Sequence, residues 1–116
     1  MDADGAPTID YAAFRRVDVR VGRIERAEPF PDARKPAYKL WIDFGPLGTR
    51  KASAQITRHY TVEELHGKRI VAVVNFPPKQ IADFMSDVLV LGVPDADGEV
   101  VLLSPDHDVP LGGRMY

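Results

Sequence analysis

Residues 17–29 read VDVRVGRIERAEP, and this stretch decides the fold. Every second residue from Val17 to Val21 is valine, with charged residues between them, which is the period of a half-buried β-strand. The apolar positions change parity after Gly22 and resume at Ile24, so we expect a bulge or sharp coil at Gly22. A long, bent first strand can pair in both halves of a small closed sheet, and it therefore predicts a β-barrel.

The rest of the chain supplies further short β-rich runs. Residues 38–44 and 49–56 alternate apolar and polar side chains, whereas 70–74 is apolar on both faces and is typical of a central strand. Residues 88–93 and 100–103 flank a turn-forming stretch and predict a hairpin. We therefore predict an all-β chain with five main strands.

Two short helices are expected beside these strands. Thr8 can cap one at the N-terminus, and Thr61 and Glu64 have the spacing of a capping box between the third and fourth strands. Five strands with a short helix at that position is the order of an OB-fold barrel, and an SH3-like barrel is the alternative. We expect a single domain over residues 1–116, with residues 1–8 flexible.

Length and composition limit the classes of protein to consider. With 116 residues, 45% of them hydrophobic and 28% charged, the chain has the size and balance of one folded domain. The absence of cysteine excludes a disulfide framework, a cysteine zinc site and a thiol nucleophile. The N-terminus is acidic where a targeting peptide needs bases, and no apolar run approaches the roughly 20 residues of a membrane span. We therefore expect a cytoplasmic protein without membrane insertion.

The charge of the chain is unevenly distributed. The net charge is −2, but residues 15–80 hold 14 of the 15 basic residues and seven of the 17 acids, so this segment carries +7. A local basic face can bind phosphates even where the whole chain is acidic. Ordinary solvated surface residues would give the same pattern, and both interpretations stay open here.

No pattern of a catalytic site stands out. The three histidines, His59, His66 and His107, are not spaced with another histidine or acid as metal ligands on one helix face. Walker, dinucleotide-binding and nucleophile-elbow motifs are absent from the sequence. We therefore expect no enzymatic activity, no metal and no cofactor.

Polar side chains near the expected strand ends indicate a binding surface instead. These residues are Ser53, Gln55, Asn75, Lys79 and Ser86. Small barrels hold single-stranded nucleic acid by hydrogen bonds to base edges, by aromatic stacking and by a basic rim. Candidates for the rim and the stacking surface are Arg34, Lys35, Lys39 and Phe76. A purely structural interpretation is equally simple, with Asn75 capping the turn and Phe76 packing beneath it.

Trp41 points away from the expected core, because it alternates with the inward residues of its strand. An outward tryptophan is either covered by another element or subunit, or available for stacking.

Several separated blocks carry a family resemblance. The segments FPDARKPAYKL, WIDFG, SAQIT, VVNFPPKQIADF and SDVLVLG resemble, in this order, the tRNA-binding domain family and, within it, the CsaA branch of export-related chaperone-like proteins. The resemblance covers about residues 9–115. It implies an OB-fold with small helical additions, a homodimer and no catalysis. It also implies binding of the outside corner of tRNA by shape and, for the CsaA branch, binding of unfolded or pre-secretory polypeptides.

The resemblance also assigns residues to the binding face. Carried over block by block, it places on this face or at its mouth Ser53, Gln55, Asn75, Phe76 and Lys79. Ser86 matches the serine of the wider family's Ser-x-Gly-Met signature, but the chain continues with Asp87, Val88 and Leu89, without the glycine or the methionine. This departure, which the CsaA branch shares, weakens the expectation of tight tRNA binding, and the charge of Asp87 opposes a phosphate.

Two functions from different classes follow. The first is a homodimeric chaperone that binds unfolded or pre-secretory polypeptides through Trp41, Phe76, Pro77, Ile81, Phe84 and Met85. The second is a trans-acting tRNA-binding protein that reads tRNA shape through Arg34, Lys35, Lys39, Ser53, Gln55, Asn75, Lys79 and Ser86. The two are compatible, because one barrel can bind RNA at its rim and peptide in a groove near the dimer. An outward Trp41 and apolar strands near both termini predict a C2 homodimer.

Overall fold

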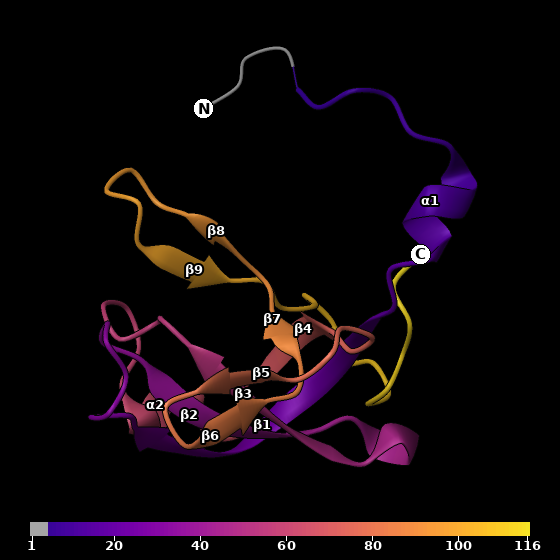
Figure 1. Ribbon diagram of the computed structural model, residues 1–116. Coiled ribbons are helices and arrows are strands. Elements are labelled where there is room, and N and C mark those ends of the chain that lie inside the picture. Colours follow the sequence, from indigo (N-terminus) through magenta and orange to yellow (C-terminus); the bar gives the residue numbers. More distant parts are fainter. Residues whose placement is uncertain (1–4) are drawn as a thin grey trace.

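Five antiparallel strands in the order β3-β2-β1-β4-β7 form the main sheet, and two hairpins, β5–β6 and β8–β9, extend it (Figure 1). The computed structural model describes residues 5–116. The elements are α1 (Tyr11–Arg15), β1 (Val19–Pro29), β2 (Tyr38–Asp43), the 3-10 turn η1 (Gly45–Leu47), β3 (Thr49–Ala54), α2 (Val62–Leu65), β4 (Arg69–Val73), β5 (Lys79–Ile81), β6 (Phe84–Ser86), β7 (Leu89–Val90), β8 (Gly92–Pro94) and β9 (Val100–Leu102). The expectation of a flexible segment 1–8 falls partly on residues 1–4, which lie outside the described residues, and it stays a prediction.

The edge strand β3 meets the segment that joins β6 to β7, so the sheet curls into a nearly closed barrel. The backbone N–H groups of Asp87 and Val88 donate to the Lys51 carbonyl at 2.8 and 3.3 Å, and the Ser53 N–H donates to Ser86 Oγ at 3.0 Å. The all-β prediction and the five-stranded, OB-fold-like barrel are confirmed. The short helix α2 lies between the third and fourth strands, as the sequence indicated.

The bulge predicted at Gly22 is wrong. β1 pairs with β4 without interruption through Gly22, and the irregularity lies further along, between Ile24 and Arg26 in the pairing with β2. The apolar residues change from odd to even positions along β1 because side chains on both faces of the strand are buried. Val19 and Val21 are buried on the face opposite to the core, where Val21 lines a pocket together with Leu103, Val109 and Met115. The backbone of residues 112–115 hydrogen-bonds along the edge of β1, and Gly22 and Ile24 face the barrel core.

Local capping motifs explain both helices. At α2, Thr61 Oγ1 accepts from the Glu64 N–H at 3.2 Å while the Thr61 N–H donates to Glu64 Oε1 at 3.0 Å, which confirms the capping box. At α1 the cap is Asp10, whose Oδ1 accepts from the Ala13 N–H at 2.9 Å, so the assignment of the cap to Thr8 is wrong. The helix begins directly after Asp10, so Asp10 occupies the N-cap position, whereas Thr8 lies two residues before it.

Two apolar clusters stabilise the molecule. The larger one fills the barrel and includes the fully buried Leu40, Ile42, Phe44 and Ile70. The smaller one lies outside the barrel and contains Phe30, Ala37 and Phe84, with Ala33, Trp41 and Ile81 packed against it.

This smaller cluster shows what covers the outward tryptophan. The Trp41 ring meets the Phe84 ring of the β5–β6 hairpin edge-on at 5.8 Å between centroids, and the Arg26 guanidinium lies 4.4 Å from the Trp41 ring centroid. Trp41 is therefore covered by elements of its own chain. Within residues 5–116, no helix is both long and apolar enough to cross a membrane.

Candidate functional site

Two adjoining pockets form a groove along strand β3. We call them the apolar pocket, of about 580 Å³, and the basic pocket, of about 600 Å³. Both are lined by Ser53, Gln55, Lys79 and Ile81. The apolar pocket is also lined by Ala54, Ile56, Phe76, Pro77, Ser86, Asp87, Val88, Leu89, Val90 and Val100. The basic pocket is also lined by Asp32, Ala33, Arg34, Lys35, Ala37, Gln80 and Ala82.

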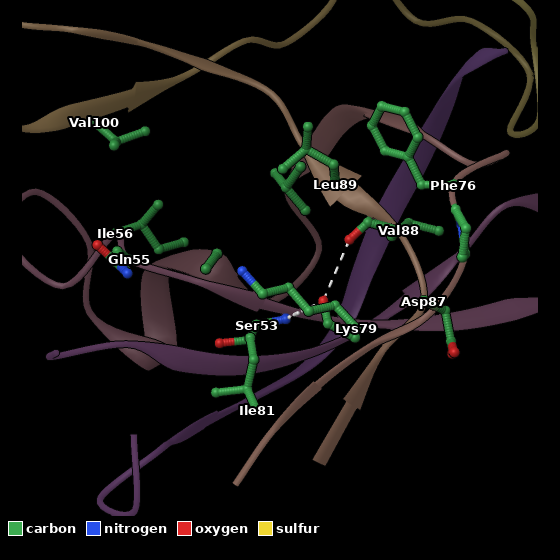
Figure 2. Close-up of a pocket in the computed structure, with 14 residues that line it drawn as sticks. Ser53, Gln55, Ile56, Phe76, Lys79, Ile81, Asp87, Val88, Leu89 and Val100 are labelled. Carbon is green, nitrogen blue, oxygen red and sulfur yellow. Dashed lines mark hydrogen bonds between the residues drawn. The ribbon is translucent and has the colours of Figure 1, made fainter. Parts of the chain in front are cut away.

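Aliphatic and aromatic side chains surround a single ammonium group in the apolar pocket. Figure 2 shows Phe76 and Leu89 on one side, Val100 on the other, and the Lys79 side chain reaching across Ser53 between them. Phe76 and Leu89 are each 50% exposed, so both offer apolar surface to a ligand. Lys79 forms no ion pair with any residue of the described part of the chain. The pocket thus combines apolar walls with one free positive charge.

The basic pocket owes its charge to the segment between β1 and β2. Phe30 and Ala37 anchor the two ends of this segment, because both side chains are buried and the Phe30 N–H donates to the Ala37 carbonyl at 3.2 Å. Arg34 and Lys35 project from it as exposed side chains without an ion pair among residues 5–116. Together with Lys79 they face one carboxylate, that of Asp32. This end of the groove is suited to an anionic group.

Ser86 and Asp87 connect strands rather than present free polar groups. Ser86 is 8% exposed, and its Oγ accepts from the Ser53 N–H and donates to the Val88 carbonyl at 3.4 Å. Asp87 Oδ2 accepts from the Lys51 N–H at 3.2 Å, and in Figure 2 the Asp87 side chain points away from the pocket. Both residues therefore close the barrel beside the groove.

Two of the residues expected to bind tRNA lie away from the groove lining. Asn75 Oδ1 accepts from the Asp18 N–H at 3.0 Å, and its Nδ2 donates to the Arg16 carbonyl at 2.7 Å, which ties the end of β4 to the segment after α1. Lys39 places its ammonium group 4.8 Å from the centroid of Phe30 and 5.3 Å from that of Phe84. The structure brings the other expected residues together at the groove: Arg34, Lys35, Ser53, Gln55, Lys79 and Ser86.

The residues expected to bind peptide divide in the same way. Phe76, Pro77 and Ile81 line the apolar pocket. Trp41 and Phe84 pack against each other in the smaller cluster, and Phe84 is 6% exposed. Met85 pairs with Gln80 across the β5–β6 hairpin and is exposed.

Sequence reasoning missed one wall of the groove and one link between loops. Val90 and Val100 come from β7 and β9, whose approach to β3 no local pattern reveals. His59 Nε2 lies 2.6 Å from Asp95 Oδ2, and this hydrogen bond, with those from the Glu99 and Asp97 N–H groups, lowers the pKa of the Asp95 carboxyl. The pair joins the loop before α2 to the turn of the β8–β9 hairpin. The residues are 36 positions apart, which hides the contact from motif analysis.

The barrel and its groove define a small binding domain, and comparison with known families identifies its class. Residues 19–114 match the family model described as "Putative tRNA binding domain". The chain belongs to this tRNA-binding domain family.

Individual relatives refine this assignment. A crystal structure of the chaperone CsaA from Bacillus anthracis str. Ames superposes with a TM-score of 0.88 at 50% identity, covering 95% of this chain and 100% of that one. The CsaA chaperone protein from Picrophilus torridus gives a TM-score of 0.87 at 52% identity, covering 94% and 100%. These matches confirm the resemblance to the CsaA branch.

The chain also matches part of a much longer enzyme. The methionine–tRNA ligase of Methanosarcina mazei is 31% identical over 109 residues, which are 94% of this chain and 15% of that enzyme. The chain thus spans about one seventh of the length of such curated relatives.

Proposed function

We propose that this chain is a non-catalytic, homodimeric chaperone that binds unfolded or pre-secretory polypeptides in the apolar pocket and tRNA at the basic pocket. One observation carries the proposal. An apolar pocket adjoins three cationic side chains that form no ion pair within residues 5–116, in a chain about half identical, over 94–95% of its length, to two CsaA chaperones. Both ligands are present in the cytoplasm, and we propose that location.

The polypeptide ligand follows from the chemistry of the apolar pocket. Unfolded chains expose apolar side chains, and moving one of valine or leucine size out of water contributes about 1.5–3 kcal/mol. Phe76 and Leu89 offer the exposed surface for this contact. Phe84 of β6 is buried in the smaller cluster and stabilises the chain's own structure instead.

Suppression of aggregation tests this site. We expect Phe76→Ala combined with Leu89→Ala to weaken protection of a chemically unfolded client protein. The matched control is Tyr11→Ala, which removes an aromatic side chain that is 68% exposed and lies outside the groove. Equal protection by the wild type, the double variant and the control would place the client elsewhere.

The tRNA ligand follows from the three cations. Each phosphate contact releases condensed counterions, so the logarithm of the binding constant falls with the logarithm of salt concentration by about 0.7–0.9 per contact. Arg34→Gln with Lys35→Gln should therefore weaken binding of bulk tRNA and lower this slope by about one to two.

A control variant with the same change of net charge distinguishes a local contact at the basic pocket from the general electrostatic attraction of tRNA. Arg16 and Arg58 are exposed and lie outside both pockets, so Arg16→Gln with Arg58→Gln changes the net charge by the same amount. Fluorescence anisotropy across a salt series measures both pairs. Equal slopes for the two double variants would remove the basic pocket from the tRNA interface.

The homodimer accounts for apolar surface outside the groove. A separate pocket of about 400 Å³ is lined by Val21, Val71, Leu103, Val109 and Met115, among others. Leu103 and Met115 are 39% and 41% exposed, and Val93 and Val101 of the β8–β9 hairpin are 49% and 38% exposed. Exposed apolar patches of this kind mark interfaces.

Light scattering tests the dimer. We expect about twice the chain mass of 12.9 kDa at micromolar concentration. Val101→Asp should shift the mass toward the monomer, because it would bury a charge in the interface. A wild-type mass of one chain would overturn this part of the proposal.

A further inference from the structure

We propose that the apolar pocket binds a small amphipathic carboxylate, with its alkyl chain against the apolar walls and its carboxylate at Lys79. This ligand is neither a polypeptide nor tRNA, so the inference goes beyond the proposed function and does not depend on it. Three observations carry it: the hydrogen bonds of the backbone beside the pocket, the apolar walls, and the positive charge where the two pockets meet.

Polar groups beside the pocket already have partners within the chain. The Ser53 N–H donates to Ser86 Oγ at 3.0 Å. The Lys51 carbonyl accepts from the N–H groups of Asp87 and Val88 at 2.8 and 3.3 Å. A ligand inside the pocket therefore finds few partners for polar groups of its own, and burying such groups without partners is unfavourable. An alkyl chain, which has no polar groups, suits this part of the pocket.

The walls of the pocket offer the surface that an alkyl chain needs. Phe76 and Leu89 are each 50% exposed, and Val100 stands on the other side of the pocket in Figure 2. The volume of about 580 Å³ lies within the range of about 300–1,000 Å³ that is typical of sites for small organic ligands. Each methylene group that leaves water for apolar surroundings raises the affinity about fourfold. The affinity should therefore grow with the length of the chain until the pocket is full.

Positive charge gathers where the apolar pocket meets the basic pocket. Lys79 lines both pockets, and its ammonium group forms no ion pair within residues 5–116. The basic pocket adds Arg34 and Lys35, and the three cations face the single carboxylate of Asp32. The side chain of Asp87, the acid in the lining of the apolar pocket, points away from it in Figure 2. The junction of the two pockets therefore attracts an anion.

These features fix the orientation of the ligand and the charge of its head group. The carboxylate lies at Lys79, and the alkyl chain extends toward Leu89 and Val100. An alcohol of the same chain length keeps the apolar contacts but lacks the charged hydrogen bond to Lys79. An alkylammonium ion brings a like charge to the same ammonium group. We therefore expect the affinity to fall from carboxylate to alcohol to ammonium.

A series of chain lengths tests the apolar part of the site. The ¹⁵N-labelled chain is titrated with hexanoate, octanoate and decanoate below the concentrations at which they form micelles, and backbone amide shifts are followed by NMR. We expect saturable shifts at Leu89 and Val100, and an affinity that rises about tenfold for each two methylene groups. Tyr11, which lies outside the pocket, should show no saturable shift. An affinity that is independent of chain length, or shifts that avoid the pocket, would overturn the proposal.

Replacement of the lysine tests the charged part. Lys79 is exposed, so Lys79→Gln should fold normally, which a thermal melt checks. We expect it to weaken octanoate binding about fivefold and to leave 1-octanol binding unchanged, because only the carboxylate loses a charged partner. Arg16→Gln is the matched control, since it removes one positive charge from an exposed residue outside both pockets. Equal losses in the two variants would contradict a contact at Lys79.

The outcomes distinguish this ligand from the proposed ones. If decanoate binds at Leu89 and Val100 with an affinity that depends on Lys79, the inference stands even where an unfolded client is not protected and the polypeptide part of the proposed function fails. If a client is protected but no carboxylate of the series gives saturable shifts, the inference is overturned and the proposed function is unaffected. If octanoate, 1-octanol and octylammonium bind equally, the pocket does not recognise the head group, and the inference is overturned.

Discussion

Replacing Ser86 by alanine should destabilise the fold rather than remove a ligand contact. The Ser86 side chain is 8% exposed, and its Oγ is the acceptor for the Ser53 N–H at 3.0 Å. Losing this acceptor leaves the N–H unpaired, which costs about 1–3 kcal/mol when the group is buried. Ser53 is half-buried, so water offsets part of the loss, and the 3.4 Å bond to the Val88 carbonyl is too long to contribute much. We therefore expect a loss of about 1–2 kcal/mol.

Ser53→Ala is a closely matched control for this experiment. It also deletes a serine hydroxyl group, on the other residue of the same contact, but the Ser53 hydroxyl makes no hydrogen bond within residues 5–116. Its effect should stay within about 0.5 kcal/mol. Urea unfolding followed by the fluorescence of Trp41, the single tryptophan, measures both at one fixed protein concentration. Equal stability of the two variants would refute the structural role of Ser86.

Three further substitutions test how the barrel is built. Gly22→Ala should destabilise the fold by about 1–3 kcal/mol in urea, because the new Cβ would stand 2.5 Å from Ile42 Cγ2; an unchanged midpoint would contradict this packing. Asn75→Ala should speed amide hydrogen exchange at Asp18, whose N–H it bonds, without altering tRNA affinity. Asp18→Asn should reduce the loss of folding free energy at low pH. The hydrogen bond from Arg20 lowers the pKa of the Asp18 carboxyl from 3.8, so the folded state binds fewer protons, and this stabilisation is present above pH 3.8 and lost as pH falls through the folded pKa. A urea midpoint that falls equally in both proteins between pH 5 and pH 3 would show that Asp18 contributes nothing.

Local patterns predicted much of this structure. The capping box of Thr61 and Glu64 is complete within one helical turn, and the alternation over residues 38–44 records which side of the strand meets the core. Features that depend on one stretch of backbone can be predicted from the sequence of that stretch. Part of the groove lining could be predicted for the same reason, since Ser53 and Gln55 alternate with the inward residues of β3.

Contacts between distant segments set the limits of those predictions. The parity change at Gly22 indicated a bulge, but the cause is burial of the outward side chains of β1, such as Val21, beside residues 103–115, more than eighty positions along the chain. Asn75 has a polar side chain of the kind that binds ligands, yet its side-chain oxygen accepts a hydrogen bond from the N–H of Asp18, 57 positions away. Polarity alone does not tell which hydrogen bonds a side chain makes inside the fold.

The sequence by itself determined the succession of strands and short helices along the chain and the family, because periodicity, capping and block order are properties of the linear chain. Only the tertiary structure decided which polar residues close the barrel and which face the groove. Ser86 and Lys79 occupy equivalent places in the β5–β6 hairpin, paired across it, but one is buried against β3 and the other reaches into the apolar pocket. The physical reason is that a hydrogen bond needs its partner within about 3 Å, and only folding brings these partners together.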